Sequence, residues 1–365
     1  MKKRIAVVTE FYSPHIGGQE IRLAELAQCF IKEGHAVDIL TIRYDDKLAR
    51  NEEKGNLKIQ RIVDDFGYKG GNGLKDRSWK TILFFSFQSC KLLKANRYDF
   101  VVFSQFPLLP IVNSRFVGIT TKRVLDFVEY RKGLFWYFIQ KMILLSSDRV
   151  VCISDSVAEQ VRKIGRRNSV SVIPSLVDIE TFQEAVNPQH FAFIGRLEAH
   201  KHPEDAIEAV IQYNKKYQTT NLIHVVGGGA LLEKLRENYS SCDNVIIHGY
   251  TSNEVKKKIL AESIALILPS EREGLPMSVI EAVASCVPII TTDYPNNGTK
   301  DFVRQEMVGL VTIPQLELMV ETIHELITQR DQYVEICKKI KQRFSLKNGA
   351  QSYIKIGLGD KKREL

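Results

Sequence analysis

Residues 264–282 read IALILPSEREGLPMSVIEA, and this stretch predicts a buried strand, a turn and a helix in that order. The continuous apolar run Ile264–Leu268 is typical of a strand that is covered on both faces. Pro276 favours the first position of a helix, where its missing N–H costs no hydrogen bond. The turn therefore places two carboxylates, Glu273 and Glu281, on either side of a helix start.

The start of this helix has the chemistry of an anion site. Free amides and the helix dipole favour a phosphate or diphosphate, and Gly274 allows the backbone to approach such a ligand closely. Glu281, on the first turns of the helix, can accept hydrogen bonds from two hydroxyls of a sugar ring. A nucleotide sugar combines both groups, so the stretch predicts a site for one.

The frame S-x-x-E-G-x-P-x-x-x-x-E-A over residues 270–282 resembles the signature of retaining GT-B glycosyltransferases of the GT4 type. Other segments resemble the same family, in the family's order along the chain. They are Gly17–Glu20, Leu26–Ala27, Gly34–Val37, Phe193–Leu197 with Lys201, and Gly309–Val311. The resemblance therefore spans most of the chain.

The resemblance implies an α/β fold of the GT-B type, with two Rossmann-like doubly wound domains that face each other across a cleft. Residues 1–180 would bind the acceptor, residues 181–345 would bind the nucleotide sugar, and residues 346–365 would return to the N-terminal domain. A length of 365 residues also favours two domains, because one core rarely serves so long a chain. We expect the linker at Val177–Gln189, where strand patterns give way to polar residues.

Short β-rich runs alternate with helical patterns in both halves, which favours parallel strands joined by crossover helices. The strands expected in the first half are Ile5–Val8, Ala36–Ile42, Lys58–Val63, Phe100–Phe103, Arg123–Phe127, Arg149–Ile153 and Ser171–Ile173. Those expected in the second half are Phe191–Ile194, Asn221–Val226, Val245–His248, Ile264–Leu268, Pro288–Thr291 and Leu310–Thr312. The expected helices include Gly18–Glu33, Pro203–Tyr217, Leu231–Tyr239 and Asn253–Ala261, the last with a capping box of Thr251 and Glu254.

The composition and the cysteine spacing indicate the class of protein and its compartment. Hydrophobic residues make up 44% of the sequence and charged residues 26%, which is ordinary for a globular protein. No apolar run approaches the ~20 residues of a membrane-spanning helix, and Met1–Arg4 leads directly into a strand instead of a signal sequence. The six cysteines lie far apart without metal-ligand spacing, so we expect reduced thiols, no metal and a cytoplasmic location.

Positive charge is concentrated in the first half of the chain. Residues 1–180 contain 29 Lys and Arg against 20 Asp and Glu, whereas residues 181–365 contain 22 against 23. A basic half can face nucleic acid, an anionic membrane or an acceptor that carries phosphate, or it can be a solvated surface without a partner. Because the sequence has no nucleic-acid-binding signature, we expect no nucleic acid partner.

The stretch Leu134–Leu145 of the basic half is apolar on too many sides for an ordinary solvent-facing helix. One interpretation is that it forms a buried core helix. The other is that it dips into the cytoplasmic face of a membrane, which would make the protein a peripheral membrane protein. The aromatic stretch Trp79–Leu93, also in the basic half, is a second candidate for this membrane role.

Arg196 and Lys201 follow the strand expected at residues 191–194, at the strand end where ligands bind in open α/β sheets. Two cations there can bind a diphosphate and stabilise the charge that develops as it leaves. The alternative is an ordinary surface Arg and Lys. The resemblance implies catalytic roles for Arg196, Lys201 and Glu273. The donor-binding residues that we expect are Gly195, Arg196, Lys201, Gly228, Tyr250, Glu273, Gly274, Leu275, Pro276, Met277 and Glu281.

Several of these expectations carry alternatives of their own. The run Gly227–Gly229 lacks the third glycine of the dinucleotide-binding motif G-x-G-x-x-G, so we interpret it as a close approach of backbone to the donor nucleotide. Tyr250 lies where the family places backbone contacts to the base, or it belongs to a simple strand-end turn. Glu273 and Glu281 would hold the sugar and the ribose, or they only favour the helix dipole.

Gly17 and Gly18 open the first helix, so their amides are expected to approach the acceptor or the donor diphosphate, unless they only form a tight turn. Family members often carry a histidine at the end of the strand that corresponds to residues 123–127, and this chain departs from that pattern. Asp126 or Glu129 would take over sugar or acceptor contacts, or these residues have a structural role.

The resulting prediction is a metal-independent, retaining glycosyltransferase that uses no cofactor. It would move a sugar from a nucleoside diphosphate donor, UDP in preference to GDP, to a glycan or lipid-linked acceptor in cell-surface polysaccharide or glycoconjugate synthesis. Retention in this family is assigned to front-side attack, so orientation and electrostatic stabilisation would supply catalysis. The alternatives are a nucleotide-sugar 2-epimerase and a non-catalytic glycosyltransferase-like subunit. The sequence leaves the sugar, the acceptor, the linkage, the pathway and the oligomeric state open.

Overall fold

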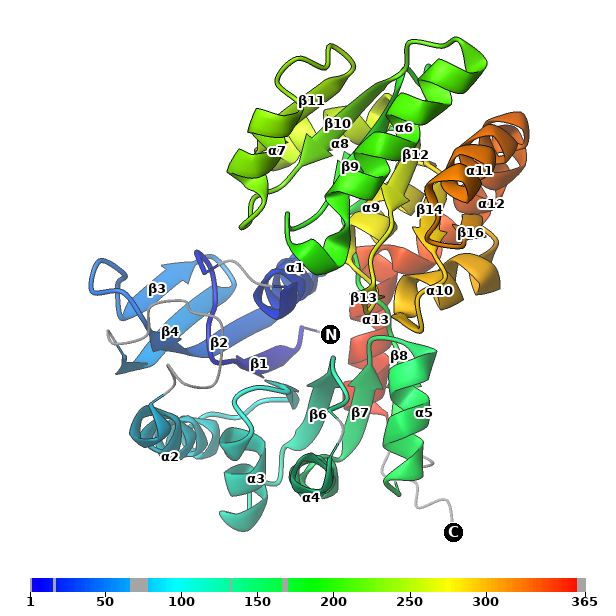
Figure 1. Cartoon of the computed structure of the whole chain (residues 1–365). Coiled ribbons are helices and arrows are strands. Elements are labelled where there is room, and N and C mark those ends of the chain that lie inside the picture. The colour runs from blue at the N-terminus through cyan, green and yellow to red at the C-terminus, as the bar shows by residue number, and fades with distance from the viewer. Residues whose placement is uncertain (1, 16–17, 66–77, 132, 166–169, 360–365) are drawn as a thin grey trace. The chain divides into compact units, whose positions relative to one another are not determined.

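A computed structural model describes residues 2–15, 18–65, 78–131, 133–165 and 170–359. The chain divides into two compact units (Figure 1). Unit 1 comprises Met1–Leu176 with Leu346–Leu365, and unit 2 comprises Val177–Ser345. The division after Leu176 lies four residues before the boundary expected after residue 180.

The sheet of unit 1 has eight strands in the order β3-β4-β2-β1-β5-β6-β7-β8. All neighbouring strands are parallel except β3, which is antiparallel to β4. Strand β3 was not predicted, because its sequence NEEK is polar and it lies largely exposed at the sheet edge. The strands are β1 (Arg4–Val8), β2 (Ala36–Arg43), β3 (Asn51–Lys54), β4 (Leu57–Asp64), β5 (Phe100–Ser104), β6 (Lys122–Phe127), β7 (Arg149–Cys152) and β8 (Val170–Val172).

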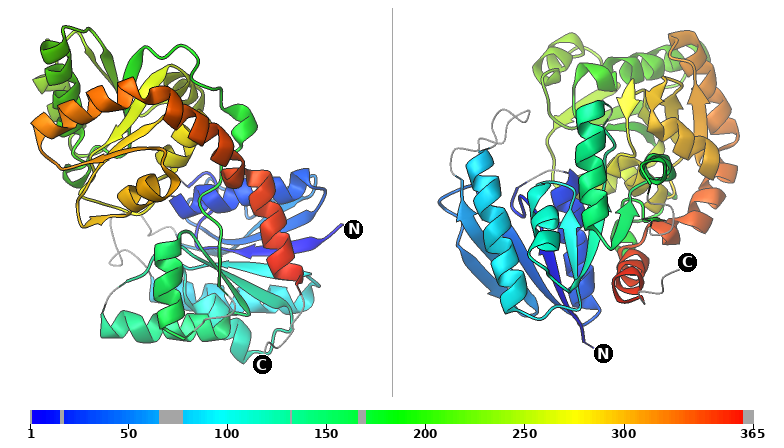
Figure 2. Two further views of the ribbon diagram at one scale, coloured as in Figure 1. Left: turned by 90° about the vertical axis from the view of Figure 1, so that its right-hand side faces the viewer. Right: turned by 90° about the horizontal axis from the view of Figure 1, so that it is seen from below.

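Helices cover both faces of this sheet, as a doubly wound fold requires (Figure 1). Helices α2, α3 and α4 lie side by side on one face, while α1 and α13 pack together on the other (Figure 2). The C-terminal helix α13 is anchored in unit 1, since Tyr353 is fully buried there. The helices of unit 1 are α1 (Gly18–Lys32), α2 (Trp79–Ala95), α3 (Leu109–Phe116), α4 (Leu134–Ser146), α5 (Asp155–Lys163) and α13 (Leu346–Leu358).

The sheet of unit 2 has six parallel strands in the order β11-β10-β9-β12-β14-β16. They are β9 (His190–Ile194), β10 (Leu222–Val226), β11 (Val245–Gly249), β12 (Ser263–Leu268), β14 (Ile289–Thr292) and β16 (Gly309–Thr312). The helices are α6 (Pro203–Tyr217), α7 (Leu232–Asn238), α8 (Asn253–Ala261), α9 (Met277–Ala284), α10 (Gly298–Glu306), α11 (Leu316–Thr328) and α12 (Arg330–Ile340). Short 3₁₀ helices cover Ile179–Thr181, Ala199–Lys201 and Lys341–Phe344. One hydrophobic core joins these elements.

Two predicted capping details of unit 2 differ from the structure by one residue. Ser252, not Thr251, caps α8, and its hydroxyl accepts a hydrogen bond from the amide of Val255. The predicted capping box is therefore wrong, because the residue three positions after Ser252 is an apolar valine. Pro276 is the N-cap of α9 instead of its first helical residue.

None of the six cysteines, all of them among the described residues, forms a disulfide, and five of the six are buried. Burial raises the pKa of the Cys152 thiol to about 12, with the nearby Asp126 carboxylate adding to the effect. Such a thiol stays protonated and unreactive at neutral pH. Among the helices of the described residues, none has both the length and the apolarity that crossing a membrane requires.

Candidate active site

The predicted donor residues gather at one edge of the unit 2 sheet. Because all six strands are parallel, their carboxyl ends share that edge. The chain enters the sheet at β9, adds β10 and β11 on one side, and then adds β12 on the other side of β9. Arg196 follows β9 and Glu273 follows β12, so the two residues flank the point where the strand order reverses. Ligands of doubly wound sheets bind at such a point.

The glycine-rich turn after β10 is packed against the turn after β9. Gly227 has φ +141°, and a Cβ there would lie 1.8 Å from the carbonyl oxygen of Gly195. A Cβ on Gly229 would lie 2.5 Å from the carbonyl oxygen of Leu197, whose amide donates to the Gly228 carbonyl at 2.9 Å. The close backbone approach that we expected at a nucleotide is thus made to the chain itself, so these glycines hold the two strand-end turns together.

Tyr250 lies over the middle glycine of this turn. A Cβ on Gly228 would lie 2.1 Å from Cε2 of the Tyr250 ring. The residue is nevertheless 84% exposed, so most of its ring is open to solvent. An exposed aromatic ring at this strand end is suited to stacking on a flat ligand such as a nucleobase.

The two predicted cations have different environments. Arg196 is exposed, whereas Lys201 is 7% exposed at the end of its 3₁₀ helix and forms an ion pair with Glu273. Burial lowers the pKa of Lys201 to about 8, with the charge of Arg196 adding to the effect. A backbone hydrogen bond of 2.9 Å from the Glu271 amide to the His200 carbonyl joins the two loops.

Glu273 is positioned by a small parallel pairing that the sequence did not reveal. Strand β13 (Arg272–Glu273) pairs with β15 (Asn296–Asn297). Asn297 is buried, caps α10 through the amide of Thr299 at 3.1 Å, and donates to the Thr292 carbonyl at 2.8 Å. Two-residue strands carry no periodic signal, so only the three-dimensional contact identifies them.

The N-terminus of α9 is open for an anion. Among the described residues, no side chain caps this helix at Pro276, and Leu275 and Met277 are half-buried beside it. Gly274 is exposed, and a Cβ on it would meet no atom of the described chain within 4 Å. The first amides of the helix therefore have no side-chain cap, and the backbone at Gly274 faces open space, which would suit an approaching phosphate.

Glu281 is buried on the second turn of α9 and has a cationic partner. Its Oε1 lies 2.6 Å from Nζ of Lys256, which projects from α8. Sequence reasoning missed Lys256, since it is one of three consecutive lysines, Lys256–Lys258, and nothing in the sequence distinguishes it from the other two. The pairing fixes the position of a carboxylate that would otherwise be buried without a counter-charge.

In unit 1, the predicted acceptor residues are not equivalent. Gly17 lies outside the described residues, and Gly18 begins α1. Glu129 is exposed in the loop after β6, and its carboxylate lies 3.1 Å from the Arg131 guanidinium. The buried Gln105 holds this loop, because its Oε1 accepts from the amides of Val128 and Glu129 at 3.0 and 2.9 Å. Gln105 was also missed by sequence reasoning.

Asp126 has the structural role that was the alternative interpretation. Its side chain is fully buried, and its carboxylate pairs with Arg22 at 3.3 Å and accepts from the Tyr353 hydroxyl at 2.5 Å. Burial alone would lower the pKa of Arg22, but Asp126 and Tyr353 raise it above its ordinary value. The expected acceptor contact at Asp126 is therefore corrected: no part of this carboxylate is accessible to an acceptor.

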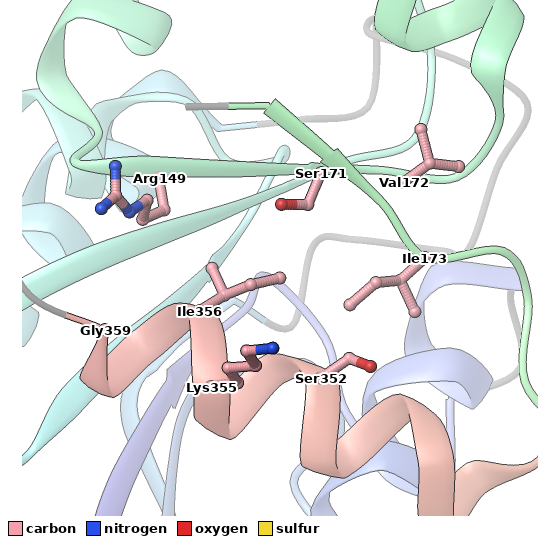
Figure 3. Close-up of a pocket in the computed structure, with 8 residues that line it drawn as sticks. All are labelled: Arg149, Ser171, Val172, Ile173, Ser352, Lys355, Ile356 and Gly359. Atoms are coloured by element: carbon pink, nitrogen blue, oxygen red, sulfur yellow. The ribbon is translucent and has the colours of Figure 1, made fainter. Parts of the chain in front are cut away.

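A cavity of about 430 Å³ lies elsewhere in unit 1, between the β7–β8 edge of the sheet and α13 (Figure 3). Arg149 and Ser171 line it from the strands, and Ser352 and Lys355 line it from the helix. None of the predicted site residues that the structure describes lines this cavity. The described residues also contain no group of three or more His, Cys, Asp or Glu side chains placed to hold a metal ion.

Solved structures with the same architecture are glycosyltransferases. Sucrose-phosphate synthase from Thermosynechococcus elongatus aligns with a TM-score of 0.75 at 16% identity, over 97% of this chain and 98% of that chain. Anabaena Alr3699/HepE, solved in complex with UDP, aligns with a TM-score of 0.69 at 14% identity, over 97% and 98%. These likenesses establish the fold, and the predicted GT-B class is confirmed.

The family follows from two matches that together cover most of the chain. The model of the family described as Glycosyl transferases group 1 matches residues 158–343, and that of Glycosyltransferase Family 4 matches residues 16–181. The chain therefore belongs to the glycosyl transferases group 1 family and is a glycosyltransferase. The resemblance identified from residues 270–282 is confirmed.

Relatives with named activities are distant in sequence. The GalNAc-alpha-(1->4)-GalNAc-alpha-(1->3)-diNAcBac-PP-undecaprenol alpha-1,4-N-acetyl-D-galactosaminyltransferase of Campylobacter jejuni is 24% identical over 93% of this chain and 94% of its own length. The O-antigen biosynthesis glycosyltransferase WbnH of Escherichia coli is 26% identical over 60% of this chain, which spans 63% of that protein. The UDP-Gal:alpha-D-GlcNAc-diphosphoundecaprenol alpha-1,3-galactosyltransferase of Escherichia coli is 26% identical over 60% of this chain and 64% of its own length.

Proposed function

We propose that the protein is a retaining glycosyltransferase that moves a sugar from a nucleoside diphosphate donor, UDP in preference to GDP, to a glycan or lipid-linked acceptor. The observation that carries this proposal is the meeting of the Lys201–Glu273 ion pair and Arg196 at the strand-order reversal of unit 2. Cations stabilise a bound diphosphate, and a carboxylate can accept hydrogen bonds from the hydroxyls of a sugar. Both kinds of side chain lie at this one edge of the unit 2 sheet.

The roles of the residues follow from this arrangement. Arg196, Lys201 and the open N-terminus of α9 would hold the diphosphate, and Glu273 would accept hydrogen bonds from the transferred sugar. Glu281 would hold the ribose, with Lys256 as a positioning residue. Gly195, Gly228, Gly274, Leu275, Pro276 and Met277 would shape the donor site, with Tyr250 against the base.

The chemical step of the proposal is front-side substitution. The bond between the anomeric carbon and the leaving phosphate oxygen breaks, the bond to the acceptor oxygen forms on the same face, and the acceptor proton passes to a phosphate oxygen. Arg196 and Lys201 would stabilise the charge on the departing diphosphate, so the protein needs no base, metal or cofactor of its own.

Unit 1 would bind the acceptor, with Gly18 and Glu129 as the proposed contacts, and the third predicted contact, Gly17, lies outside the described residues. The names of the relatives support a lipid-linked or polysaccharide product, since they include O-antigen biosynthesis and an undecaprenol diphosphate acceptor. One of these names also includes UDP-Gal, which supports UDP as the donor nucleotide. Six cysteines without a disulfide among them support a reducing compartment, and we propose that the reaction takes place in the cytoplasm.

A transfer assay tests this function. The protein is incubated with UDP-sugars and GDP-sugars, with and without acceptors built on diphosphoundecaprenol, and the anomeric configuration of the product is read by NMR. We expect transfer with retention that EDTA does not reduce. Epimerisation at C2 of the donor would establish the epimerase alternative, and donor binding without turnover of any kind would establish the non-catalytic one.

A further inference from the structure

Helix α2 presents an apolar outer face although its inner face is already packed. Ile82, Phe85 and Cys90 are buried against the sheet of unit 1. The outer face carries large apolar side chains that are each more than half exposed and recur at helical spacing: Trp79, Leu83, Phe84 and Phe87. Exposed aromatic residues in such a row are not needed for the core of unit 1.

Helix α4 repeats this arrangement. Ile143 and Leu144 are buried, so the interpretation of residues 134–145 as a wholly buried helix is wrong for the outer side. That side exposes Leu134, Phe135, Phe138, Met142 and Leu145. Between α2 and α4 lies α3, whose last residue, Phe116, is 81% exposed.

The three helices form one layer. Helix α3 contacts both α2 and α4, and all three cover the same face of the unit 1 sheet (Figure 2). Their outer faces therefore form one surface, which we call the α2–α4 face and define by the exposed apolar residues of α2, α3 and α4 named above. Monomeric soluble proteins rarely expose ten large apolar side chains on one layer of helices.

The charges of these helices have one sign. Their sequences contain Lys80, Lys91, Lys94, Arg115 and Lys141, all exposed, and no Asp or Glu. These five cations equal more than half of the excess positive charge of residues 1–180. The α2–α4 face is therefore basic as well as apolar.

A further cation lies at the start of α4. The Arg131 guanidinium lies 4.7 Å from the centre of the Trp136 ring and 4.8 Å from that of Phe106. Contact with two aromatic faces fixes this side chain in place. The Glu129 carboxylate, 3.1 Å from the guanidinium, balances its charge, so Arg131 anchors the loop before α4 but adds no net charge to the α2–α4 face.

We propose that the α2–α4 face docks on the surface of an anionic lipid bilayer. Aromatic and aliphatic side chains on one face with Lys and Arg among them are the composition of interfacial helices, whose apolar side enters the boundary between headgroups and acyl chains. The lysines and Arg115 then meet anionic headgroups. A second copy of this chain fits the face poorly, because it would set the same five cations against one another.

Vesicle co-sedimentation of the full chain tests this docking. Vesicles of phosphatidylcholine alone are compared with vesicles of equal parts phosphatidylcholine and phosphatidylglycerol, at low and high salt. We expect binding to the anionic vesicles at low salt and its loss at high salt, because salt screens the headgroup attraction. No preference for anionic vesicles at low salt would overturn the proposal. The vesicles contain no glycosyl acceptor, so this outcome is independent of whether the proposed transfer reaction is correct.

Paired variants locate the surface. Lys80→Gln with Lys91→Gln should weaken binding to anionic vesicles by about 25-fold, at about fivefold for each cation, and Phe84→Ser with Phe87→Ser should weaken it by about tenfold or more. Val186→Ser, which removes an exposed apolar side chain of unit 2, should bind as the unmodified protein does. All these side chains are exposed, so circular dichroism should show folded protein in each case. Unchanged vesicle binding of both paired variants would overturn the proposal. It would also be overturned if light scattering showed that the unmodified protein is a dimer and that the Phe84→Ser, Phe87→Ser variant is a monomer.

Discussion

Nζ of Lys256 lies 2.6 Å from Oε1 of Glu281, and this contact joins α8 to α9 at the proposed donor site. The glutamate is buried, so its charge needs a partner in the folded protein. The lysine supplies that partner and fixes the direction of the carboxylate. The carboxylate is thereby positioned before any nucleotide binds, which lowers the entropic cost of binding.

Replacement of Glu281 by alanine should weaken nucleotide binding. The ribose hydroxyls would lose a charged acceptor, at a cost of about 1.5–3 kcal/mol in binding free energy. Calorimetric titration with UDP and with GDP measures this loss. Glu254→Gln on α8, where the carboxylate is exposed, is the matched control and should leave both affinities unchanged. If Glu281→Ala binds both nucleotides as tightly as the unmodified protein, the ribose contact does not exist.

Removal of either proposed diphosphate-binding cation should lower kcat by about 10²–10³-fold, because each stabilises charge on the leaving group. The two variants should differ in thermal stability. Arg196→Ala should melt near the unmodified midpoint, since Arg196 is exposed. Lys201→Ala should melt lower, because it leaves Glu273 without its partner. Steady-state rates and thermal melts measure both effects, with Lys258→Ala as an exposed-lysine control. Near-normal turnover of either variant would remove that residue from the catalytic step.

The transferase rate should fall at alkaline pH. Burial lowers the pKa of Lys201 to about 8, so the ammonium that binds the diphosphate is lost as pH rises through that value, and kcat/KM should decrease above about pH 8. Lys201→Arg carries a guanidinium that stays charged in this range. Its pH–rate profile should lack the alkaline decline, although its maximum rate should be lower because the longer side chain displaces the charge. The same decline in both proteins would assign it to another group.

The regular elements of this fold were predictable, because their burial imposes a pattern of apolar residues on the sequence. Helices α6 and α8 have the predicted bounds, and every predicted strand has a counterpart in the two sheets. Strand β3 and the pair β13 and β15 were missed. Strand β3 is polar and lies at a sheet edge, and β13 and β15 are only two residues long. None of the three therefore has a sequence pattern to detect.

The candidate site was predictable only where a motif fixes residue type and spacing. Such a motif identified Arg196, Lys201, Glu273 and Glu281. Lys256 was not predictable, since its role depends on α8 packing beside α9. Asp126 was open to both interpretations, because an aspartate at a strand end is the same letter whether it faces a ligand or, as here, a buried arginine from a helix 104 positions away.

Three neighbouring histidines in the unit 2 sheet should make the protein sensitive to acid. The rings of His190 and His224 stack at 4.0 Å, and His248 Nε2 lies 3.0 Å from His224 Nδ1. Burial lowers the pKa of His224 to about 4, with its two histidine neighbours adding to the effect. In the unfolded chain the same group titrates near 6.5. Stability is therefore complete above about pH 6.5 and is lost as pH falls toward 4, by an amount on the order of 3 kcal/mol for His224.

Urea unfolding at neutral and acidic pH measures this loss. His224→Gln should show a shallower decline in the unfolding midpoint, because it removes a group that binds its proton more readily in the unfolded chain. His324→Gln is a matched control on α11 and should decline as the unmodified protein does. An equal acid sensitivity of His224→Gln and the unmodified protein would locate the titration elsewhere.

Asp126 and Glu129 lie three residues apart, but amide substitution should destabilise the protein only at Asp126. Asp126→Asn keeps the shape but removes the charge that faces Arg22, whose side chain is 2% exposed. A buried guanidinium without its partner costs about 3–5 kcal/mol, so this variant should lose most of its margin of stability. Glu129→Gln changes an exposed carboxylate and should leave the unfolding midpoint near that of the unmodified protein.

The kinetic comparison then separates structure from acceptor binding. If Glu129 contacts the acceptor, Glu129→Gln should raise the acceptor KM by about tenfold, the loss of one charge-assisted hydrogen bond, while the donor KM stays unchanged. Glu159→Gln, an exposed glutamate on α5 of the same unit, should change neither constant. If Glu129→Gln leaves the acceptor KM unchanged, Glu129 does not contact the acceptor. The proposed contacts of unit 1 would then be the backbone amides at the start of α1, where Gly18 begins the helix.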